Sequence, residues 1–306
     1  MCSKKYSYLL NLCPTHNIHK GGKKYYMITM VKITFVKLGN ITLTTLIDIM
    51  LDERASRKDI EATVISSSTK MKPEAAERLF PLIDQVETDL MVMISPNAKD
   101  KGPQLIIEKY KDKYPLIVVS DTADKEMREK WKAEGVGYII ASFDPMIGAK
   151  LDFLDPTEMC LFNGYIIETF SACGVFAYIT RLFAGVIDQL KAGDKPELPL
   201  KNLSPIGVTE SYPFGNDYSR PKAYAALRIL QDAGSLNVNG CWGEKDANRA
   251  LDKVAAAHEM VRQASKIADE VRELEKASGH LVRTPHNKEG EIYHKIHFFD
   301  NAHKEH

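Results

Sequence analysis

The chain has 306 residues, and its 41 Lys and Arg balance 41 Asp and Glu, so the net charge at pH 7 is zero. This balance argues against a surface that follows nucleic-acid phosphates, and no apolar run approaches the roughly 18 residues that a membrane span needs. The length permits one large or two modest domains, and five scattered cysteines predict reduced thiols in the cytoplasm.

Residues 1–29 differ from the rest because they are polar, basic and rich in Tyr and His. Their longest apolar run, Leu9-Leu10, is too short for a signal peptide. We interpret 1–29 as an extension that is either disordered or a misassigned start before Met30. Cys13, His16 and His19 form only a weak metal-ligand pattern, and we expect no metal there.

From residue 30 to 154, short apolar segments alternate with amphipathic helices. The predicted strands are 31–36, 62–65, 90–94, 116–119 and 138–141. The predicted helices follow the Gly39-Asn40 turn, begin near Pro73, and cover 104–113 and 125–134. Nearly continuous apolar strands separated by helices indicate a parallel sheet covered on both faces. We therefore predict an α/β fold whose residues 30–154 form the coenzyme-binding part.

Residues 155–298 are expected to be helical, with a few extra short strands. Asp155, Pro156 and Glu158 form a helix start, with an N-cap, a first-position Pro and an acidic third position. This helical region should reach Lys191, with a break near Cys173-Gly174. Further helices are expected at 220–232 and 248–278, strands at 235–242 and 290–298, a surface crossover at 196–216 and a tail at 299–306.

Polar and turn-forming residues follow each of the five predicted strands. Ligands of open α/β sheets bind beyond the carboxyl ends of the strands, so these loops together predict a binding crevice. They are Gly39-Asn40, Ser66-Ser67-Ser68-Thr69, Ser95-Pro96-Asn97, Ser120-Asp121-Thr122 and Phe143-Asp144-Pro145. No G-x-G-x-x-G motif follows the first strand, which disfavours a nicotinamide coenzyme in its ordinary binding mode.

Three blocks of sequence carry a resemblance to a known family. They are VKLGN with LDERASRKDIE (residues 36–40 and 51–61), DPMIGAKLDFLDPTEMCLFN (144–163), and AHEM, ADEVRELEK and LVRTPH within residues 255–286. In these blocks the chain resembles the F420-dependent methylenetetrahydromethanopterin dehydrogenases, from about residue 30 to 297. The resemblance implies reversible hydride transfer between the one-carbon unit of the pterin and coenzyme F420, with no metal.

The resemblance also implies the setting of the reaction. The substrate would be tetrahydromethanopterin or tetrahydrosarcinapterin carrying the one-carbon unit, and coenzyme F420 would act as co-substrate. Such a chain belongs to archaeal one-carbon metabolism and methanogenesis in the cytoplasm, and it forms a homo-oligomer that is hexameric by resemblance. Nucleic acid and membranes are not expected partners.

Candidate site residues follow from the loops and the resemblance together. A hydride transfer that yields a delocalised cation needs two aligned rings, exclusion of water and a carboxylate near the developing charge. Asp144 and Asp121 are the predicted electrostatic catalytic residues. The predicted coenzyme-binding residues are Gly39, Asn40, Ser68, Thr69, Pro96, Asn97, Asp121 and Thr122, and the predicted substrate-binding residues are Asp144, Met146, His258, Arg283 and His286.

Some of these assignments have a structural alternative. Asp144 could instead cap the Asp-Pro turn, His258 could be a structural histidine of a helix, and His286 could close a hairpin. The amides that open the helix after Asn40 are also candidates for holding an anion of the coenzyme.

Two loops depart from the family pattern, at Lys99-Asp100-Lys101 and at Thr122-Ala123-Asp124. Extra acid beside an anionic coenzyme would weaken binding, unless Lys99, Lys101 or Lys125 compensates. The departures motivate a rival hypothesis, a non-catalytic pterin- or nucleotide-binding relative acting as a sensor or assembly partner. A third hypothesis is an oxidoreductase that binds a nicotinamide coenzyme in an atypical mode.

Overall fold

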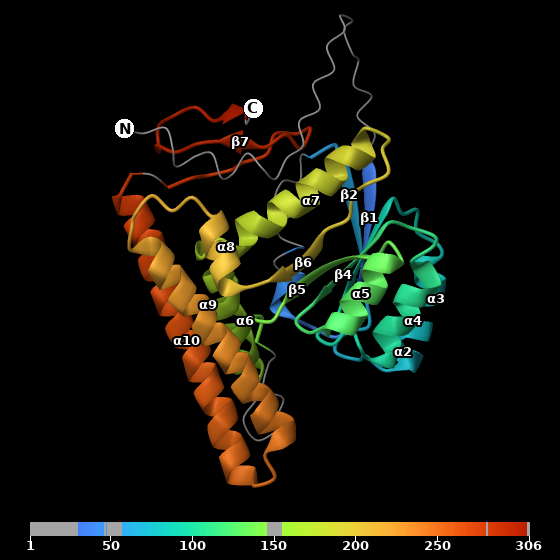
Figure 1. Ribbon diagram of the computed structural model, residues 1–306, viewed down its shortest axis with the longest axis horizontal. Helices are drawn as coiled ribbons and strands as arrows, with labels where there is room; N and C mark the ends of the chain where they lie inside the picture. Colours follow the sequence, from blue (N-terminus) through green and yellow to red (C-terminus); the bar gives the residue numbers. More distant parts are fainter. Residues whose placement is uncertain (1–29, 46, 48–56, 146–154, 280, 305–306) are drawn as a thin grey trace, which may run out of the picture.

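The core of the protein is a six-stranded parallel sheet with strand order β2-β1-β3-β4-β5-β6 (Figure 1). The computed structural model describes residues 30–45, 47, 57–145, 155–279 and 281–304. The strands are β1 (Val31–Lys37), β2 (Ile60–Ser66), β3 (Leu90–Ile94), β4 (Leu116–Ser120), β5 (Gly137–Ala141) and β6 (Leu200–Leu203). All five predicted strands are confirmed, and the predicted fold class is confirmed with them.

All strands run the same way, so their carboxyl ends lie along one side of the sheet and their amino ends along the opposite side. We call these two sides the carboxyl edge and the amino edge, to be distinguished from the outermost strands β2 and β6. The chain passes from β1 to β2 on one side and then to β3 on the other side of β1. The strand order therefore reverses between β1 and β3, and the loops after these two strands flank the place where such sheets bind ligands.

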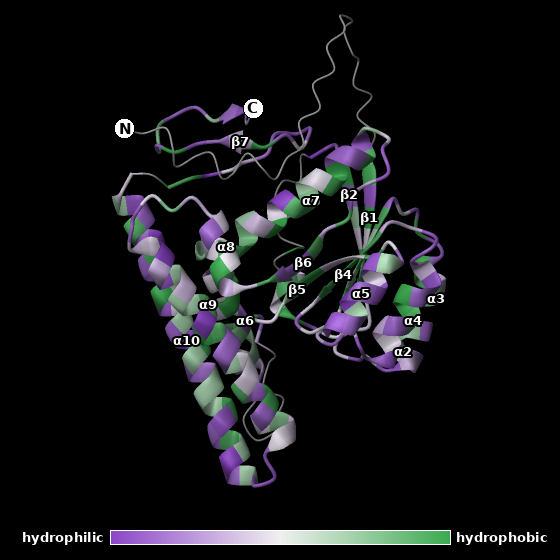
Figure 2. Cartoon of the chain, in the orientation of Figure 1, coloured by the Kyte–Doolittle hydropathy of each residue, from purple (hydrophilic) through white to green (hydrophobic). Residues whose placement is uncertain are grey.

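Each face of the sheet is covered by helices, and β1, β3, β4 and β5 contribute side chains to both cores. Ile33 and Phe35 pack into one core, whereas Val36 of the same strand packs into the other because successive side chains of a strand point to opposite faces. Helices α2 (Pro73–Glu77), α3 (Phe80–Ile83), α4 (Lys101–Tyr110) and α5 (Lys125–Ala133) cover one face, and α6 (Pro156–Ala172) and α7 (Val175–Lys191) begin the cover of the other. Figure 2 shows the apolar strands enclosed by helices with a polar outer side.

The helix start at Asp155 and the break near Cys173-Gly174 are both confirmed. The Asp155 carboxylate accepts a hydrogen bond from the Glu158 N–H at 2.8 Å, which caps α6. α6 ends at Ala172, and α7 begins at Val175 after Gly174 with φ of 89°. No single helix in the described ranges is long and apolar enough to cross a membrane; α6 and α7 pass that test only as a pair, bent by 72°.

The remaining helices form a long arm beside the sheet (Figure 1). They are α8 (Pro205–Ser211), α9 (Ser219–Val238), the π-helix η2 (Asn239–Gly243) and α10 (Ala247–Ala277). The strand predicted at 235–242 is wrong, because these residues complete α9 and form η2. Local β-propensity there is overridden by the packing of the α9 end and η2 against α10.

The segment 196–216 is not the surface crossover that was predicted. It contains β6, which pairs with β5 in parallel, and α8, whose first turn is capped by Ser204 accepting from the Gly207 N–H at 3.1 Å. β6 thus comes from the later half of the chain but completes the sheet built by residues 31–141. The proposed division of the chain at 154/155 therefore does not coincide with the limit of the sheet.

The C-terminal residues form a small antiparallel pair of strands, β7 (Tyr293–His294) and β8 (His303–Lys304). The strand predicted over 290–298 is reduced to β7 with isolated bridges at Arg283–Lys295 and His286–Ile292. This segment reaches the amino edge, where the Lys58 N–H donates to the Lys288 carbonyl oxygen at 2.8 Å. The proposed extension 1–29 lies outside the described residues.

Candidate functional site

The loops after β1 and β3 touch at the point where the strand order reverses. Gly39 has φ of 85°, and a Cβ atom there would lie 2.7 Å from both Pro96 Cδ and Met71 Sδ. Its N–H donates to the Ser68 carbonyl oxygen at 3.0 Å. Glycine is required here because the backbone is left-handed and no space remains for a side chain. Gly39, Ser68 and Pro96 are therefore brought together at the carboxyl edge.

The loops after β3 and β4 are joined to each other by backbone and side-chain bonds. Asn97 and Thr122 form a parallel bridge that prolongs the β3–β4 ladder. The Ser120 hydroxyl donates to the Thr122 carbonyl oxygen at 3.0 Å and accepts from the Ala98 N–H at 3.3 Å. Two more predicted coenzyme-binding residues are thus held side by side.

The two loops that depart from the family pattern are joined by an ion pair between Lys99 and Asp124. Lys99 Nζ lies 2.6 Å from Asp124 Oδ2, and Asp124 Oδ1 accepts from the Met127 N–H at 2.8 Å, which caps α5. The Lys99 ammonium and this cap lower the pKa of Asp124. The additional acid of the fourth loop is therefore paired with the additional base of the third.

Asp144 links the loop after β5 to the helix after β1, on the far side of β3 and β4. Its Oδ2 accepts from the Leu43 N–H at 2.8 Å, and its Oδ1 lies 3.4 Å from the Thr42 nitrogen. The side chain is almost completely buried, and burial raises the pKa of Asp144 to about 7 against the lowering effect of these amides. The carboxylate caps the helix that follows β1, so the amides proposed for a coenzyme anion are already engaged.

Asp121 is a second carboxyl group at the same edge, and one of its two oxygens has no hydrogen-bond partner. Its Oδ1 is buried and forms no hydrogen bond, although the residue as a whole is partly exposed. Burial, followed by the negative charge of Asp144, raises the pKa of Asp121 well above its ordinary value. The buried hydroxyls of Ser95, after β3, and Thr44, after β1, are also without hydrogen bonds. The carboxyl edge therefore holds polar atoms that the described part of the chain does not satisfy.

α6 and α10 extend this neighbourhood on one side of the sheet. Asn163 of α6 has its Oδ1 3.4 Å from the Thr42 hydroxyl, next to the amides that bind Asp144. One turn earlier, Glu158 lies 2.8 Å from His258 Nδ1, and the His258 ring packs on Phe162 with centroids 4.2 Å apart. His258 is buried, and burial lowers its pKa although Glu158 opposes that shift.

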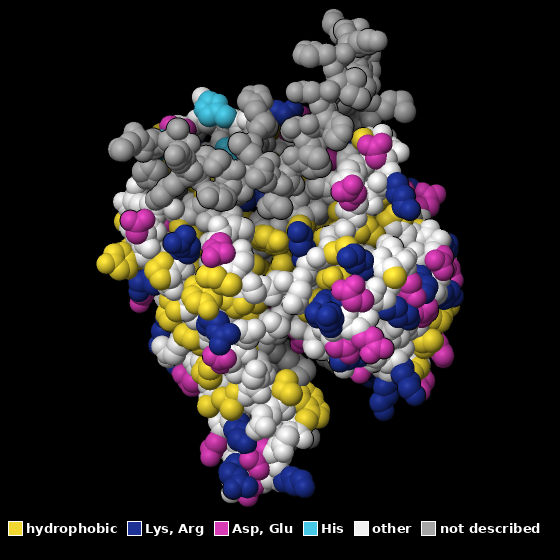
Figure 3. Space-filling model, viewed as in Figure 1, with side chains coloured by type: hydrophobic (Ala, Val, Ile, Leu, Met, Phe, Trp, Pro, Cys, Tyr) yellow, Lys and Arg dark blue, Asp and Glu magenta, His cyan; other side chains and the backbone are white. Residues whose placement is uncertain are grey.

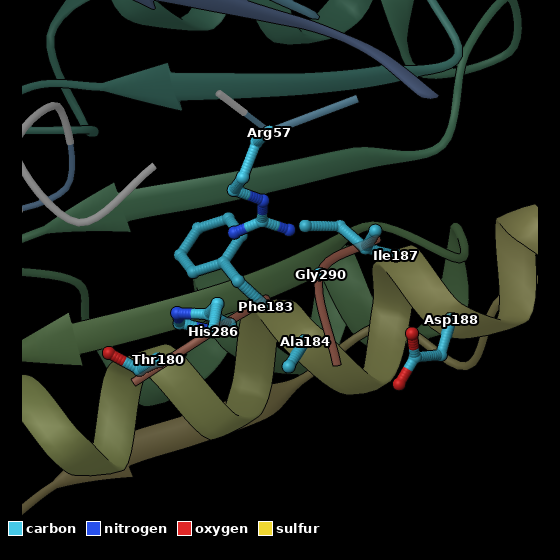
Figure 4. Close-up of a pocket in the computed structure, with 8 residues that line it drawn as sticks. All are labelled: Arg57, Thr180, Phe183, Ala184, Ile187, Asp188, His286 and Gly290. Atoms are coloured by element: carbon cyan, nitrogen blue, oxygen red, sulfur yellow. The ribbon is translucent and has the colours of Figure 1, made fainter. Parts of the chain in front are cut away.

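Arg283 and His286 lie at the amino edge and are not brought together with the residues above. His286 lines a small cavity of about 10 Å³ with Arg57, Asp188 and Gly290 (Figure 4), which is space for about one water. Arg283 exchanges backbone hydrogen bonds with Lys295 at 2.8 and 2.9 Å. A substrate role for Arg283 and His286 therefore stays a prediction. Met146 lies outside the described residues.

The same amino edge contains a buried ionic network. Asp59 accepts from Arg57 Nε and Nη2, both at 2.8 Å, and from Lys191 Nζ at 3.3 Å. Burial alone would raise the pKa of Asp59, but the hydrogen bonds and charge of Arg57, followed by Lys191, lower it below its usual value. Lys191 also donates to the Glu289 carbonyl oxygen at 2.7 Å, which ties the C-terminal segment to α7.

Several partnerships of the site were not predicted from the sequence. Ser120 and the amides that open the helix after Asn40 were expected in the crevice, but the bonds of Ser120 to Ala98 and Thr122, and of the amides to Asp144, were not. Asn163 and Glu158 lie inside the block 144–163 that carries the resemblance, so that block was the available signal.

No group of three or more metal-ligating side chains occurs within the described ranges. Over α3–α5, Figure 3 shows charged side chains of both signs interspersed.

Comparison with known proteins gives a consistent result over most of the chain. The family model described as methylene-5,6,7,8-tetrahydromethanopterin dehydrogenase matches residues 31–303. A protein of Archaeoglobus fulgidus named F420-dependent methylenetetrahydromethanopterin dehydrogenase is 40% identical over 263 residues, which are 86% of this chain and 96% of that protein. Its namesake from Methanocaldococcus jannaschii is 38% identical, over 85% of this chain and 95% of that protein.

A solved structure agrees with these relatives. It is an F420-dependent methylene-tetrahydromethanopterin dehydrogenase in complex with methylene-tetrahydromethanopterin and coenzyme F420. It superposes with a TM-score of 0.85 at 35% identity and covers 90% of this chain and all of that one. The six-stranded sheet and the helices around it are therefore those of a protein that binds both compounds.

Proposed function

Because the chain belongs to the family of methylene-tetrahydromethanopterin dehydrogenases, we propose that it transfers a hydride reversibly between methylenetetrahydromethanopterin and coenzyme F420. The observation that carries the proposal is the likeness, over nine-tenths of the chain, to a dehydrogenase bound to both compounds. The reaction oxidises the methylene group to a methenyl cation and reduces the deazaflavin. No metal enters this proposal.

The carboxyl edge fits two flat ring systems in chemical terms. Gly39 allows a ring or phosphate to approach the backbone closely, and the bonds between the β3 and β4 loops hold Asn97 and Thr122 in fixed positions. The unsatisfied atoms of Ser95 and Asp121 can bond to a polar ligand. We propose that Gly39, Asn40, Ser68, Thr69, Pro96, Asn97, Asp121 and Thr122 hold the deazaflavin.

The protein contributes alignment, desolvation and electrostatics, since the reacting rings carry the hydride chemistry themselves. We propose that Asp144 acts by fixing the first turn after β1, which places Gly39 and Asn40. His258 is positioned by Glu158 and Phe162 on the side of α6, where the pterin would lie. Met146, Arg283 and His286 remain candidates for the pterin.

The structure weakens the reason for a non-catalytic alternative. That hypothesis rested on extra acid in the fourth loop, but Asp124 is paired with Lys99 and caps α5. A neutralised acid repels an anionic coenzyme much less than a free one. We therefore prefer the enzyme to the sensor or assembly partner.

The proposal is tested by mixing purified protein with oxidised coenzyme F420 and methylenetetrahydromethanopterin. The visible absorbance of the oxidised coenzyme should fall, and it should stay constant without the pterin or when NAD or NADP replaces the deazaflavin. If folded protein binds both compounds but the absorbance does not change, the enzymatic function is wrong. A reaction with NADP alone would support the atypical nicotinamide hypothesis.

The assembly and the cellular location are further proposals. We propose a homo-oligomer, hexameric by resemblance, in the cytoplasm. Exposed apolar side chains on α6, α9 and η2 support subunit contacts, with Leu161 46%, Val238 49% and Trp242 63% exposed. Sedimentation or light scattering of the purified protein measures the state, and a monomer at micromolar concentration would contradict it.

A further inference from the structure

Two carboxyl groups follow neighbouring strands at the carboxyl edge of the sheet. Asp121 follows β4 and Asp144 follows the neighbouring β5, and the charge of Asp144 is felt at Asp121. Within the described part of the chain, no Lys or Arg forms an ion pair with either group. Asp144 accepts two backbone N–H groups, whereas Asp121 Oδ1 is buried with no partner.

This difference in partners decides which group holds a proton. An ionised carboxylate is destabilised when one of its oxygens is buried with neither a donor nor a cation beside it, and this favours the protonated form. Amide donors stabilise the ionised form, which leaves Asp144 as the better place for a negative charge. Asp121 is therefore the neutral member of the pair.

A neutral acid at this position answers a need of the proposed reaction. When a hydride leaves the methylene carbon, that carbon becomes a methenyl cation, and the hydride adds to a carbon of the deazaflavin. The electron pair displaced within the deazaflavin moves to a ring nitrogen, which must take a proton. The Asp121 side chain, which is partly exposed, lies among the loops proposed to hold this ring, and solvent can return its proton afterwards.

We propose that Asp121 is the catalytic acid that protonates the ring nitrogen of coenzyme F420 as the hydride arrives. The O–H bond of the Asp121 carboxyl breaks, and an N–H bond forms on the coenzyme. The carboxylate left behind is negative at the moment when the methenyl cation appears, so one proton transfer balances both charges. The inference rests on the proposed function and names a residue role within it.

Asp144 is a less suitable donor for geometric reasons. Its two oxygens face the amides of Thr42 and Leu43, and only 3% of the residue is exposed. Asp144→Asn keeps an acceptor for these amides and so serves as the matched control. Ser95 and Asn97 of the adjoining β3 loop carry no charge, and among the described residues Asp144 is the group whose charge acts on Asp121.

The first measurement needs no substrate and reads the proton directly. Infrared difference spectra of the ligand-free protein at pH 8 should show the C=O band of a protonated carboxyl group. This band should vanish in Asp121→Asn and persist in Asp144→Asn. A band that is unaffected by Asp121→Asn, or an Asp121 that titrates as ionised at pH 8, overturns the inference.

The second measurement follows coenzyme reduction in a single turnover. With saturating oxidised coenzyme F420, the rate of reduction in Asp121→Asn should fall about 100-fold, as for loss of a general acid. The wild-type rate should fall at high pH as Asp121 ionises, and the variant should lack that decline. Small carboxylic acids should partly restore the rate of Asp121→Ala.

A reduction rate of Asp121→Asn within about threefold of wild type would overturn the inference. Asp121→Ser lacks the acid too and replaces Asp121→Asn if that variant does not fold. Failure of the proposed function looks different, because then wild-type protein would show the carboxyl band but would not reduce coenzyme F420. The two ideas can thus fail separately.

Discussion

Two aspartates with buried carboxyl oxygens, at opposite edges of one sheet, have opposite surroundings. At the amino edge, Asp59 is bound by Arg57 and Lys191, and its pKa is lowered. At the carboxyl edge, Asp121 has a buried oxygen without a partner, and its pKa is raised. A complete set of partners is what stability requires, whereas an incomplete set costs stability and is retained where a ligand or a proton is handled.

The largest expected effect comes from removing the amino-edge carboxylate. Asp59→Ala removes the counter-charge of the largely buried Arg57 side chain and one of the two carboxylates near Lys191, which should lower the free energy of unfolding by about 3 kcal/mol. Chemical denaturation measures it. The control Asp232→Ala removes an exposed ion pair with Arg228 and should change stability by less than about 0.5 kcal/mol. Equal effects would contradict the structural role of Asp59.

The sign of the pH dependence should also differ between the edges. The pKa of Asp59 is lowered in the folded state, so its stabilisation is complete above its ordinary pKa and is lost as the pH falls. The pKa of Asp144 is raised to about 7, so its contribution is complete in acid and is lost as the pH rises through about 7. Between pH 5 and 8, wild-type stability should therefore fall relative to Asp144→Asn. Parallel pH profiles of the two proteins would contradict the burial of an ionisable Asp144.

A smaller loss of stability is expected when a methyl group is added at Gly290, next to the ionic network of the amino edge. Gly290 has φ of 78°, and a Cβ there would lie 1.9 Å from Asp59 Oδ2. Gly290→Ala should cost about 2 kcal/mol, because strain adds to displacement of the carboxylate. Gly279 has φ of 68° with open space around its Cβ position, so Gly279→Ala should show only the strain, about 1 kcal/mol. Thermal unfolding compares the two, and a smaller loss for Gly290→Ala would count against the packing described.

Loss of the Asp144 cap should cost less again. Asp144→Ala removes the acceptor for the amides of Thr42 and Leu43 and should destabilise the protein by about 1 kcal/mol, while Asp144→Asn should lose less. Coenzyme affinity should fall in Asp144→Ala, since the turn after β1 places Gly39. Fluorescence titration with coenzyme F420 tests this, and unchanged affinity would mean that the cap does not position the loop.

The smallest effect belongs to the exposed pair between Lys99 and Asp124. Lys99→Gln should change stability by less than about 0.5 kcal/mol but weaken coenzyme F420 binding by about two- to fivefold, because Asp124 is then unpaired. Adding Asp124→Asn, which keeps an acceptor for the α5 cap, should restore the affinity. If the double variant binds as weakly as the single one, Lys99 contacts the coenzyme itself.

The sheet was predictable because its central strands are nearly continuous apolar runs. β6 was missed because its sequence, LKNL, is short and amphipathic and because β6 is the outermost strand of the sheet. Nothing in these four residues indicates that they pair with β5. The strand predicted at 235–242 was wrong because tertiary packing prolonged α9.

The site was predictable only in part. Polar residues after each strand were found, since parallel strands bring such loops to one edge. Their partnerships were not, because Asp144 and Leu43 are 101 positions apart and Asp59 and Lys191 are 132 apart. The sequence could suggest two acids, but not that one accepts two amides of a distant helix while the other has a buried oxygen without a partner.

The most direct test of the contrast between the two edges is a structure of the protein with oxidised coenzyme F420 and the methenyl-pterin both bound. We expect stacked rings over the ends of β1, β3 and β4, with the Asp121 carboxyl facing a ring nitrogen of the deazaflavin and Asp59 unchanged in its network. Rings bound at the amino edge beside Arg57 and His286, or an Asp121 that faces neither ring, would contradict the account.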